Sequence, residues 1–181
     1  MAKLCAAGIQ LREQIDDDYP DRDRKSDGWI ADSRHIAKGT SDHIPDSKSG
    51  IVRAIDIDSD LSAHKEEAYA LVEKIRKLAK KGDKRIAYII FDGKIMSPIL
   101  GWKRRKYNGS NPHRSHFHIS FTTLGDKNGS YFNLEGEANE RPEESSRELG
   151  KDIRSNSPSD LSSSRPRCQC NCQCRSSVSL A

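Results

Sequence analysis

The chain has 181 residues, of which 34% are hydrophobic and 32% are charged. This polar composition predicts one domain with a modest core plus additional chain. The formal net charge of +4 suits anionic surroundings such as a cell wall, but it is far smaller than the charge of most nucleic-acid-binding proteins. We therefore expect no nucleic-acid partner.

The N-terminal segment contains a short apolar run at residues 4–9. It is too short for a transmembrane helix, which needs about 20 apolar residues. It also lacks the apolar region and cleavage site of a signal peptide. Leu4, Leu11 and Ile15 instead predict one face of a first helix that ends before Tyr19.

The segment from residue 40 to residue 58 resembles one half of a polar site. His43 lies in a loop, and residues 51–57 then predict a strand in which Asp56 stands between two isoleucines. A carboxylate in such a run would point away from the apolar core and towards a site. The alternative is that Asp56 and Asp58 lie on the solvated face of an edge strand.

One arginine precedes this segment and another lies within it. Arg34, in a short helical stretch at residues 32–35, and Arg53 are candidates for binding a substrate carboxylate, because a guanidinium pairs with it bidentately. For both, an ordinary salt bridge is an alternative. We expect His35 to support the structure and not to bind a ligand.

The middle of the chain predicts scaffold. Residues 63–81 repeat apolar side chains at three- and four-residue steps, typical of an amphipathic helix that ends at Gly82. Residues 85–91 predict a buried strand, and Asp92-Gly93 is a strong hairpin signal with a return through residues 94–97.

A basic cluster at residues 103–106 follows Trp102. We expect a solvated or wall-facing loop here, although contact with nucleic acid is an alternative. Tyr107 is predicted to lie at the rim of the site and to contact substrate.

Histidines gather between residues 111 and 121. His116 and His118 are two residues apart on a predicted strand, so both imidazoles would face one pocket. Pro112 excludes a central strand at its own position and leaves His113 on the segment that leads in. Imidazole is the commonest metal ligand in proteins.

Two histidines of the site and Asp56 would supply three ligands to a metal ion, and one further histidine of the site would not bind the metal. Catalytic zinc sites keep three protein ligands and one open position. Two nitrogens and one oxygen suit zinc better than calcium or magnesium, which prefer oxygen. The remaining histidine would act as general base or stabilise the oxyanion.

Three blocks carry a family resemblance: Ser41-x-His43, Ala54-x-Asp56 and His116-x-His118. Together they resemble the zinc peptidases of the D-alanyl-D-alanine carboxypeptidase and L-alanyl-D-glutamate endopeptidase group, which shares its site with lysostaphin-type and hedgehog-type zinc domains. The resemblance covers roughly residues 10–123 and is strongest to small peptidase domains of bacteriophage endolysins. Those domains carry runs similar to residues 26–30, 41–43, 52–56 and 107–118.

The resemblance implies that His43, Asp56 and His118 hold Zn²⁺. His116 would be the catalytic histidine, with His113 assisting it. Ser41 of the first block joins Arg34, Arg53 and Tyr107 as a predicted substrate contact.

The chain departs from the group's pattern in two ways. The step from His43 to Asp56 is longer than usual, which makes Asp58 a competing ligand. The glutamate of the group's E-x-x-H motif is absent. An alternative assignment makes His116 the ligand and His113 the base, but the group's H-x-H places the ligand second and so favours His118.

By this resemblance the protein would be a metallopeptidase that hydrolyses peptide bonds in the peptide stems of peptidoglycan. It would be a monomer, made in the cytoplasm, that acts on the cell wall after release or as part of a phage particle. Two alternatives are a non-catalytic zinc-containing cell-wall-binding module and a His-metal nuclease.

The predicted fold is α+β. A small antiparallel sheet of about four strands, covered by helices, would carry zinc on its open face over residues 1–135. Residues 136–181 predict a charged linker, with a loose helix at 137–154, and a disordered Ser-, Arg- and Cys-rich tail. Its four alternating cysteines, at residues 168–174, are a weaker candidate for capturing a soft metal.

Overall fold

The computed structural model describes residues 1–39, 41–64 and 66–135, and the side chains of Arg34, His35 and Lys38 are also outside the description. The predictions for residues 136–181, including the loose helix, the disordered tail and the cysteine run, lie outside the described residues.

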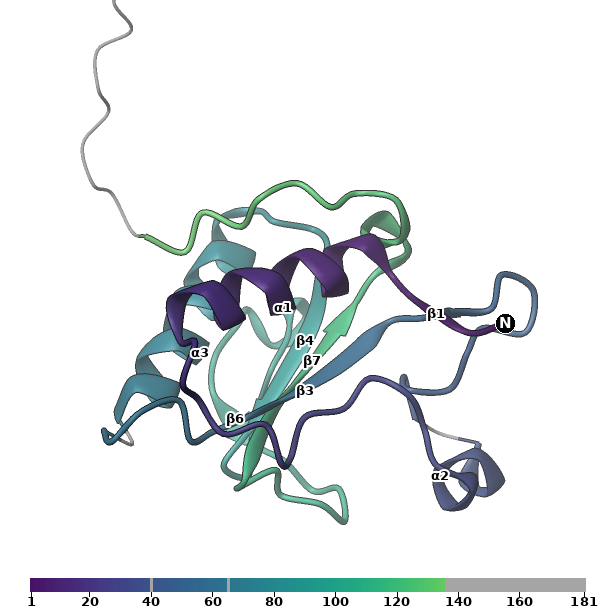
Figure 1. Cartoon of the computed structure of the whole chain (residues 1–181), viewed down its shortest axis with the longest axis horizontal. Helices are drawn as coiled ribbons and strands as arrows, with labels where there is room; N and C mark the ends of the chain where they lie inside the picture. Colours follow the sequence, from purple (N-terminus) through teal and green to yellow (C-terminus); the bar gives the residue numbers. More distant parts are fainter. Residues whose placement is uncertain (40, 65, 136–181) are drawn as a thin grey trace, which may run out of the picture. The chain divides into compact units, whose positions relative to one another are not determined.

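The main sheet is antiparallel throughout and has the strand order β3-β7-β4-β5-β6 (Figure 1). Its strands are β3 (Ala54–Asp58), β4 (Ile86–Phe91), β5 (Lys94–Met96), β6 (Arg105–Lys106) and β7 (His116–Phe121). The predicted α+β class is confirmed. The sheet has five strands and not about four, because β6 is a short exposed pair without an apolar pattern.

A second, two-stranded sheet pairs β1 (Lys3–Leu4) with β2 (Ile51–Val52) in parallel. The prediction that Leu4 belongs to the first helix is therefore wrong. The predicted strand at residues 51–57 is divided at Arg53, whose guanidinium turns to Asp126 and forms bonds of 2.6 Å to both carboxylate oxygens.

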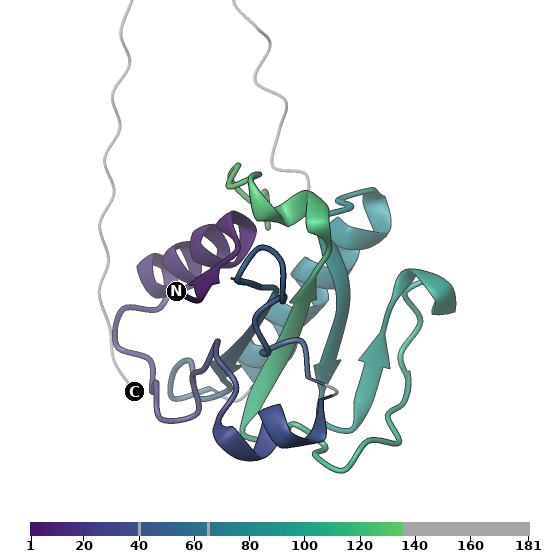
Figure 2. The same ribbon diagram turned by 90° about the vertical axis from the view of Figure 1, so that its right-hand side faces the viewer.

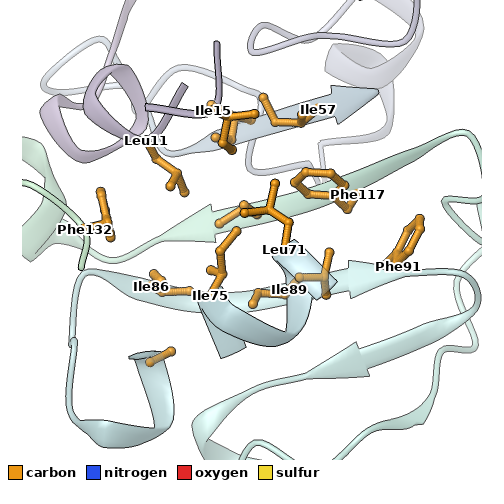
Figure 3. Packing of buried hydrophobic residues seen from close by; sticks show 14 of the residues in the cluster. Leu11, Ile15, Ile57, Leu71, Ile75, Ile86, Ile89, Phe91, Phe117 and Phe132 are labelled. Carbon is orange, nitrogen blue, oxygen red and sulfur yellow. The ribbon is translucent and has the colours of Figure 1, made fainter. Parts of the chain in front are cut away.

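Two long helices cover one face of the main sheet (Figures 1 and 3). Helix α1 (Ala6–Asp18) ends before Tyr19 as predicted, and α3 (Glu66–Lys81) begins later than predicted, although it ends at Gly82 as expected. The apolar stripes of both helices meet the alternate apolar residues of the strands. Labelled members of this core in Figure 3 are Leu11, Ile15, Ile57, Leu71, Ile75, Ile86, Ile89, Phe91, Phe117 and Phe132.

The opposite face of the sheet is approached by loops. The short helix α2 (Ser33–Lys38) and the segment that leads to β2 lie across the sheet from α3 in both views (Figures 1 and 2). Two 3₁₀ turns, Pro98–Leu100 and Thr123–Asp126, complete the described elements. The loops therefore border the face on which the polar side chains of the strands gather.

Strand β4 contains a β-bulge. Ile86 pairs with Phe121 and Tyr88 pairs with Ser120, so Ala87 is an extra residue that the partner strand does not match. Because side chains alternate between faces, Ile86 and Tyr88 would share a face in a regular strand. The extra residue instead leaves Ile86 in the core and turns Tyr88 to the opposite face.

The hairpin predicted at Asp92-Gly93 is confirmed, and both residues have positive φ, 44° and 67°, as a type I′ turn requires. Its amides also reach a distant loop. Asp92 N donates to the His113 carbonyl at 2.9 Å, and Gly93 N donates to the Pro112 carbonyl at 2.7 Å. The turn thereby fixes the backbone of the segment that leads into β7.

The outer edge of β3 is closed by the loop before α2. Gly28 and Asp56 exchange backbone hydrogen bonds at 3.0 and 2.7 Å. The loop is held by Arg22, whose side chain is fully buried and donates to both carboxylate oxygens of Asp27 and to Asp16. Asp27 in turn accepts the amide of Asp58 at 2.8 Å.

We expect Arg22→Met to destabilise the protein by about 3–5 kcal/mol, because it leaves Asp27 in a largely buried position without its cation. Urea unfolding followed by circular dichroism measures the change. The matched control is Arg24→Met, since Arg24 also pairs with Asp16 but is 45% exposed, and its change should stay below about 1 kcal/mol. Equal changes in the two variants would show that the buried pair does not hold the loop.

Candidate metal centre

The face of β7 opposite the core carries His116, His118 and Ser120, while Phe117 and its alternate partners point into the core. The strand register places Asp56 of β3 directly opposite His118. Side chains opposed in this way have Cβ atoms about 4.5–5.5 Å apart. Sheet pairing alone therefore brings the carboxylate beside the imidazole.

His43 comes to this pair from a loop. The backbone amide of His43 donates to Ser41 Oγ at 3.3 Å, and its carbonyl accepts from the amide of Ala31 at 2.9 Å. These bonds attach the loop on both sides and direct the ring towards the sheet.

Two ring nitrogens and the two oxygens of one carboxylate converge where the loop meets the sheet. His118 Nδ1 is 2.8 Å from Asp56 Oδ1, His43 Nε2 is 3.2 Å from Asp56 Oδ2, and the two ring nitrogens are 3.1 Å apart. A tetrahedral ion with bonds of about 2.0–2.1 Å places its ligands about 3.3–3.4 Å apart. The three separations are slightly shorter than that spacing, and the group could hold a metal ion.

The protonation of His118 is set by a hydrogen-bond chain on its other side. Tyr88 OH and Ser120 Oγ both donate to Asp42 Oδ2, each at 2.7 Å. Ser120 has then used its only proton, so its oxygen accepts from His118 Nε2 at 2.9 Å. The proton of a neutral His118 is therefore on Nε2, and the lone pair of Nδ1 faces Asp56 and His43.

The electrostatics of the group follow from this arrangement. Burial alone would raise the pKa of Asp56, but the imidazoles of His118 and His43 hydrogen-bond to the carboxylate when they are protonated, and they lower its pKa well below its usual range. Burial would lower the pKa of His43, but the carboxylate of Asp56 outweighs it and raises that pKa. The carboxylate thus stays charged and attracts a cation, either a proton or a metal ion.

His116 and His113 lie on the open side of this group. His116 Nε2 is 3.8 Å from Asp56 Oδ2, while its Nδ1 is 3.2 Å from Ser115 Oγ. Burial lowers the pKa of His116 and lowers that of His113 to about 4, helped by the neighbouring histidines. With Asp56, they form a second group that could hold a metal ion.

Asp58, the competing ligand, is engaged elsewhere. Its carboxylate accepts the backbone amides of Ser26 and Asp60, both at 2.9 Å. In the part of the chain that the structure describes, Asp58 belongs to neither group that could hold an ion.

A pocket of about 350 Å³ opens over the donor atoms. Ser41 and Tyr107 line it, so the structure brings these two predicted substrate contacts to the site. Arg53 instead forms the bidentate pair with Asp126, which corresponds to the salt-bridge alternative. The side chain of Arg34 lies outside the description. A larger hollow of about 750 Å³, bordered by residues 18–21, 23, 25 and 60–63, has no histidine among the lining residues described.

The basic cluster after Trp102 is on the far edge of the sheet. Arg104 pairs with Glu73 at 2.9 Å, and Arg105 and Lys106 form the exposed edge strand β6. The predicted exposure is therefore confirmed, but the prediction of a loop is wrong at Arg105 and Lys106, which pair with β5. None of these three side chains lines the pocket.

Sequence reasoning missed Asp42, Tyr88 and Ser120. Ser120 was detectable, because it continues the two-residue step of His116 and His118. Tyr88 was not, because regular alternation would place it on the same face as Ile86, in the core, and the bulge at Ala87 turns it to the opposite face. Asp42 reaches Ser120 only through the fold of its loop.

No family model matches the sequence, and no curated protein or solved structure matches it. Within the described residues, every helix is too short or too polar to cross a lipid bilayer.

We expect Ser120→Ala to weaken metal binding by about 10- to 100-fold, because the chain that holds His118 in its ligating tautomer is cut. Competition with a chromophoric chelator measures the affinity. The control is Thr122→Val, which removes a hydroxyl just beyond β7 that bonds only the Lys84 carbonyl. Unchanged affinity in Ser120→Ala would show that the tautomer does not depend on Ser120.

Proposed function

We propose that the protein is a zinc-dependent hydrolase of peptide bonds in the stem peptides of peptidoglycan. The observation that carries the metal dependence is the convergence of His43 Nε2, His118 Nδ1 and Asp56 within 3.2 Å of one another. Lone pairs that face a carboxylate at this distance repel it unless a proton or a metal ion lies between them, and a metal ion would satisfy all three groups at once.

The donor set fits zinc. Two imidazole nitrogens and one carboxylate oxygen match catalytic zinc sites, which leave a fourth position open. A zinc ion held by these three residues would lower the pKa of a bound water to about 7 and would polarise a carbonyl as a Lewis acid. The pocket beside these ligands is also lined by His113 and His116.

His116 is placed to handle the proton. Its Nε2 projects beside Asp56 into the pocket, and Ser115 Oγ fixes the opposite ring nitrogen. From this position His116 can accept a proton from the attacking water or stabilise the oxyanion that forms. Tyr107 borders the same pocket and would contact the peptide.

The peptide substrate is supported by the three motif blocks. Ser41, His43, Asp56, His116 and His118, which carry the resemblance to the D-alanyl-D-alanine and L-alanyl-D-glutamate peptidases, all lie around one pocket. Action on the cell wall, after release or from a phage particle, belongs to the same proposal.

The proposal predicts one tightly bound zinc per chain and release of amino groups from purified peptidoglycan, both abolished by a chelator. Metal analysis and an amino-group assay measure the two quantities. Zinc without release would favour a non-catalytic wall-binding module. Cleavage of plasmid DNA in place of peptidoglycan would favour a nuclease.

Single substitutions separate ligand from catalyst. His43→Ala, Asp56→Ala or His118→Ala should lose both tight zinc and activity, while His116→Ala should keep tight zinc and lose at least about 100-fold in rate. Equilibrium dialysis and the release assay follow each variant. If His116→Ala loses the tight zinc and His118→Ala keeps it, the ligands are assigned the wrong way round.

A further inference from the structure

Asp56 belongs to two groups of donor atoms. One is His43, Asp56 and His118, and the other is Asp56, His113 and His116, whose donor atoms also lie within 4.8 Å of one another. Oδ1 of Asp56 is directed to His118, while Oδ2 is near both His43 and His116. A carboxylate placed in this way can bridge two ions, which in two-metal sites lie about 3.5–4 Å apart.

His113 has a nitrogen that the protein does not satisfy. Its Nδ1 is buried and, among the described residues, has no hydrogen-bond partner. Buried polar atoms nearly always have a partner, so an unpaired nitrogen on this ring, whose centroid is 5.0 Å from that of His116, indicates a missing ligand.

The backbone of His113 is held in place at a cost. Its φ of 51° is in the left-handed region, which non-glycine residues seldom occupy. Three hydrogen bonds hold it there. The His113 amide donates to Asn111 Oδ1 at 3.0 Å, and the two amides of the β4–β5 turn donate to the carbonyls of His113 and Pro112. Such a conformation persists where the surrounding structure imposes it, and it is concentrated at functional sites.

We infer that Asp56, His113 and His116 form a second zinc site, weaker than the first. It is weaker because Asp56 shares its charge with the first ion, and because the His116 to Asp56 separation of 3.8 Å exceeds each separation in the first group. A second ion would occupy the nitrogen of His116 that otherwise handles the proton. Excess zinc would therefore inhibit hydrolysis; this consequence rests on the proposed function, while the site itself does not.

The test is zinc stoichiometry by equilibrium dialysis on the full chain. Because Cys168, Cys170, Cys172 and Cys174 can bind zinc, all proteins carry serine at these four positions. The parent should bind two zinc ions with distinct affinities. His113→Asn should keep only the tighter ion, and asparagine is chosen because it tolerates positive φ.

His118→Ala gives the complementary result, since it should lose the tight ion and keep a weak one. His116→Gln repeats the test without altering the strained backbone, and it should also bind only the tight ion. A parent with one zinc, or two zinc ions retained in both His113→Asn and His116→Gln, would overturn the second site.

Activity supplies an independent readout. Hydrolysis by the parent should fall at least 10-fold between one equivalent of zinc and saturation of the weak site, and His113→Asn should lose this fall whatever its basal rate. A parent that fills both sites without inhibition would overturn the regulatory consequence. The stoichiometric pattern without any hydrolysis would instead refute the proposed function and leave the second site standing.

Discussion

Strand β7 lies between β3 and β4, and its register with both is the constraint on which the structure depends. The six residues of β7 alternate between the apolar core and the face that carries the site. Phe117 and its alternate partners close the core under α1 and α3, and His116, His118 and Ser120 form the floor of the site. A slip of one residue would exchange the two sets. The same apolar contacts that stabilise the fold therefore fix the positions of the histidines.

The elements that the sequence predicted well have local patterns. The α3 helix, the Asp92-Gly93 turn and the H-x-H strand are each specified within a few residues by periodicity or turn chemistry. The convergence of Asp56 with His118 followed from flanking isoleucines, because an apolar strand leaves its polar residue on the other face. These features needed no knowledge of distant contacts.

What the sequence did not predict depends on contacts between distant segments. The strand at residues 51–57 is divided because β2 pairs with β1 whereas β3 pairs with β7. Asp58 is outside the site because its carboxylate accepts the amides of Ser26 and Asp60. The hydrogen bonds from Tyr88 and Ser120 to Asp42 join three separate segments, so no local sequence pattern predicts them. Sequence spacing alone does not decide whether His116 or His118 is the metal ligand. In the structure the His118 ring bonds to Asp56 and Ser120, whereas the His116 ring bonds to Ser115.

The bulge in β4 has a mechanical consequence. The strand contains one residue more than its partner uses, and a bulge increases the local right-handed twist. Deleting Ala87 would leave every other β4 side chain on its present face, yet it would flatten the sheet beneath Tyr88. The curvature of the sheet beneath the site is thus set by the number of residues in β4. A one-residue change could reshape the pocket while every chemical group in it stayed the same.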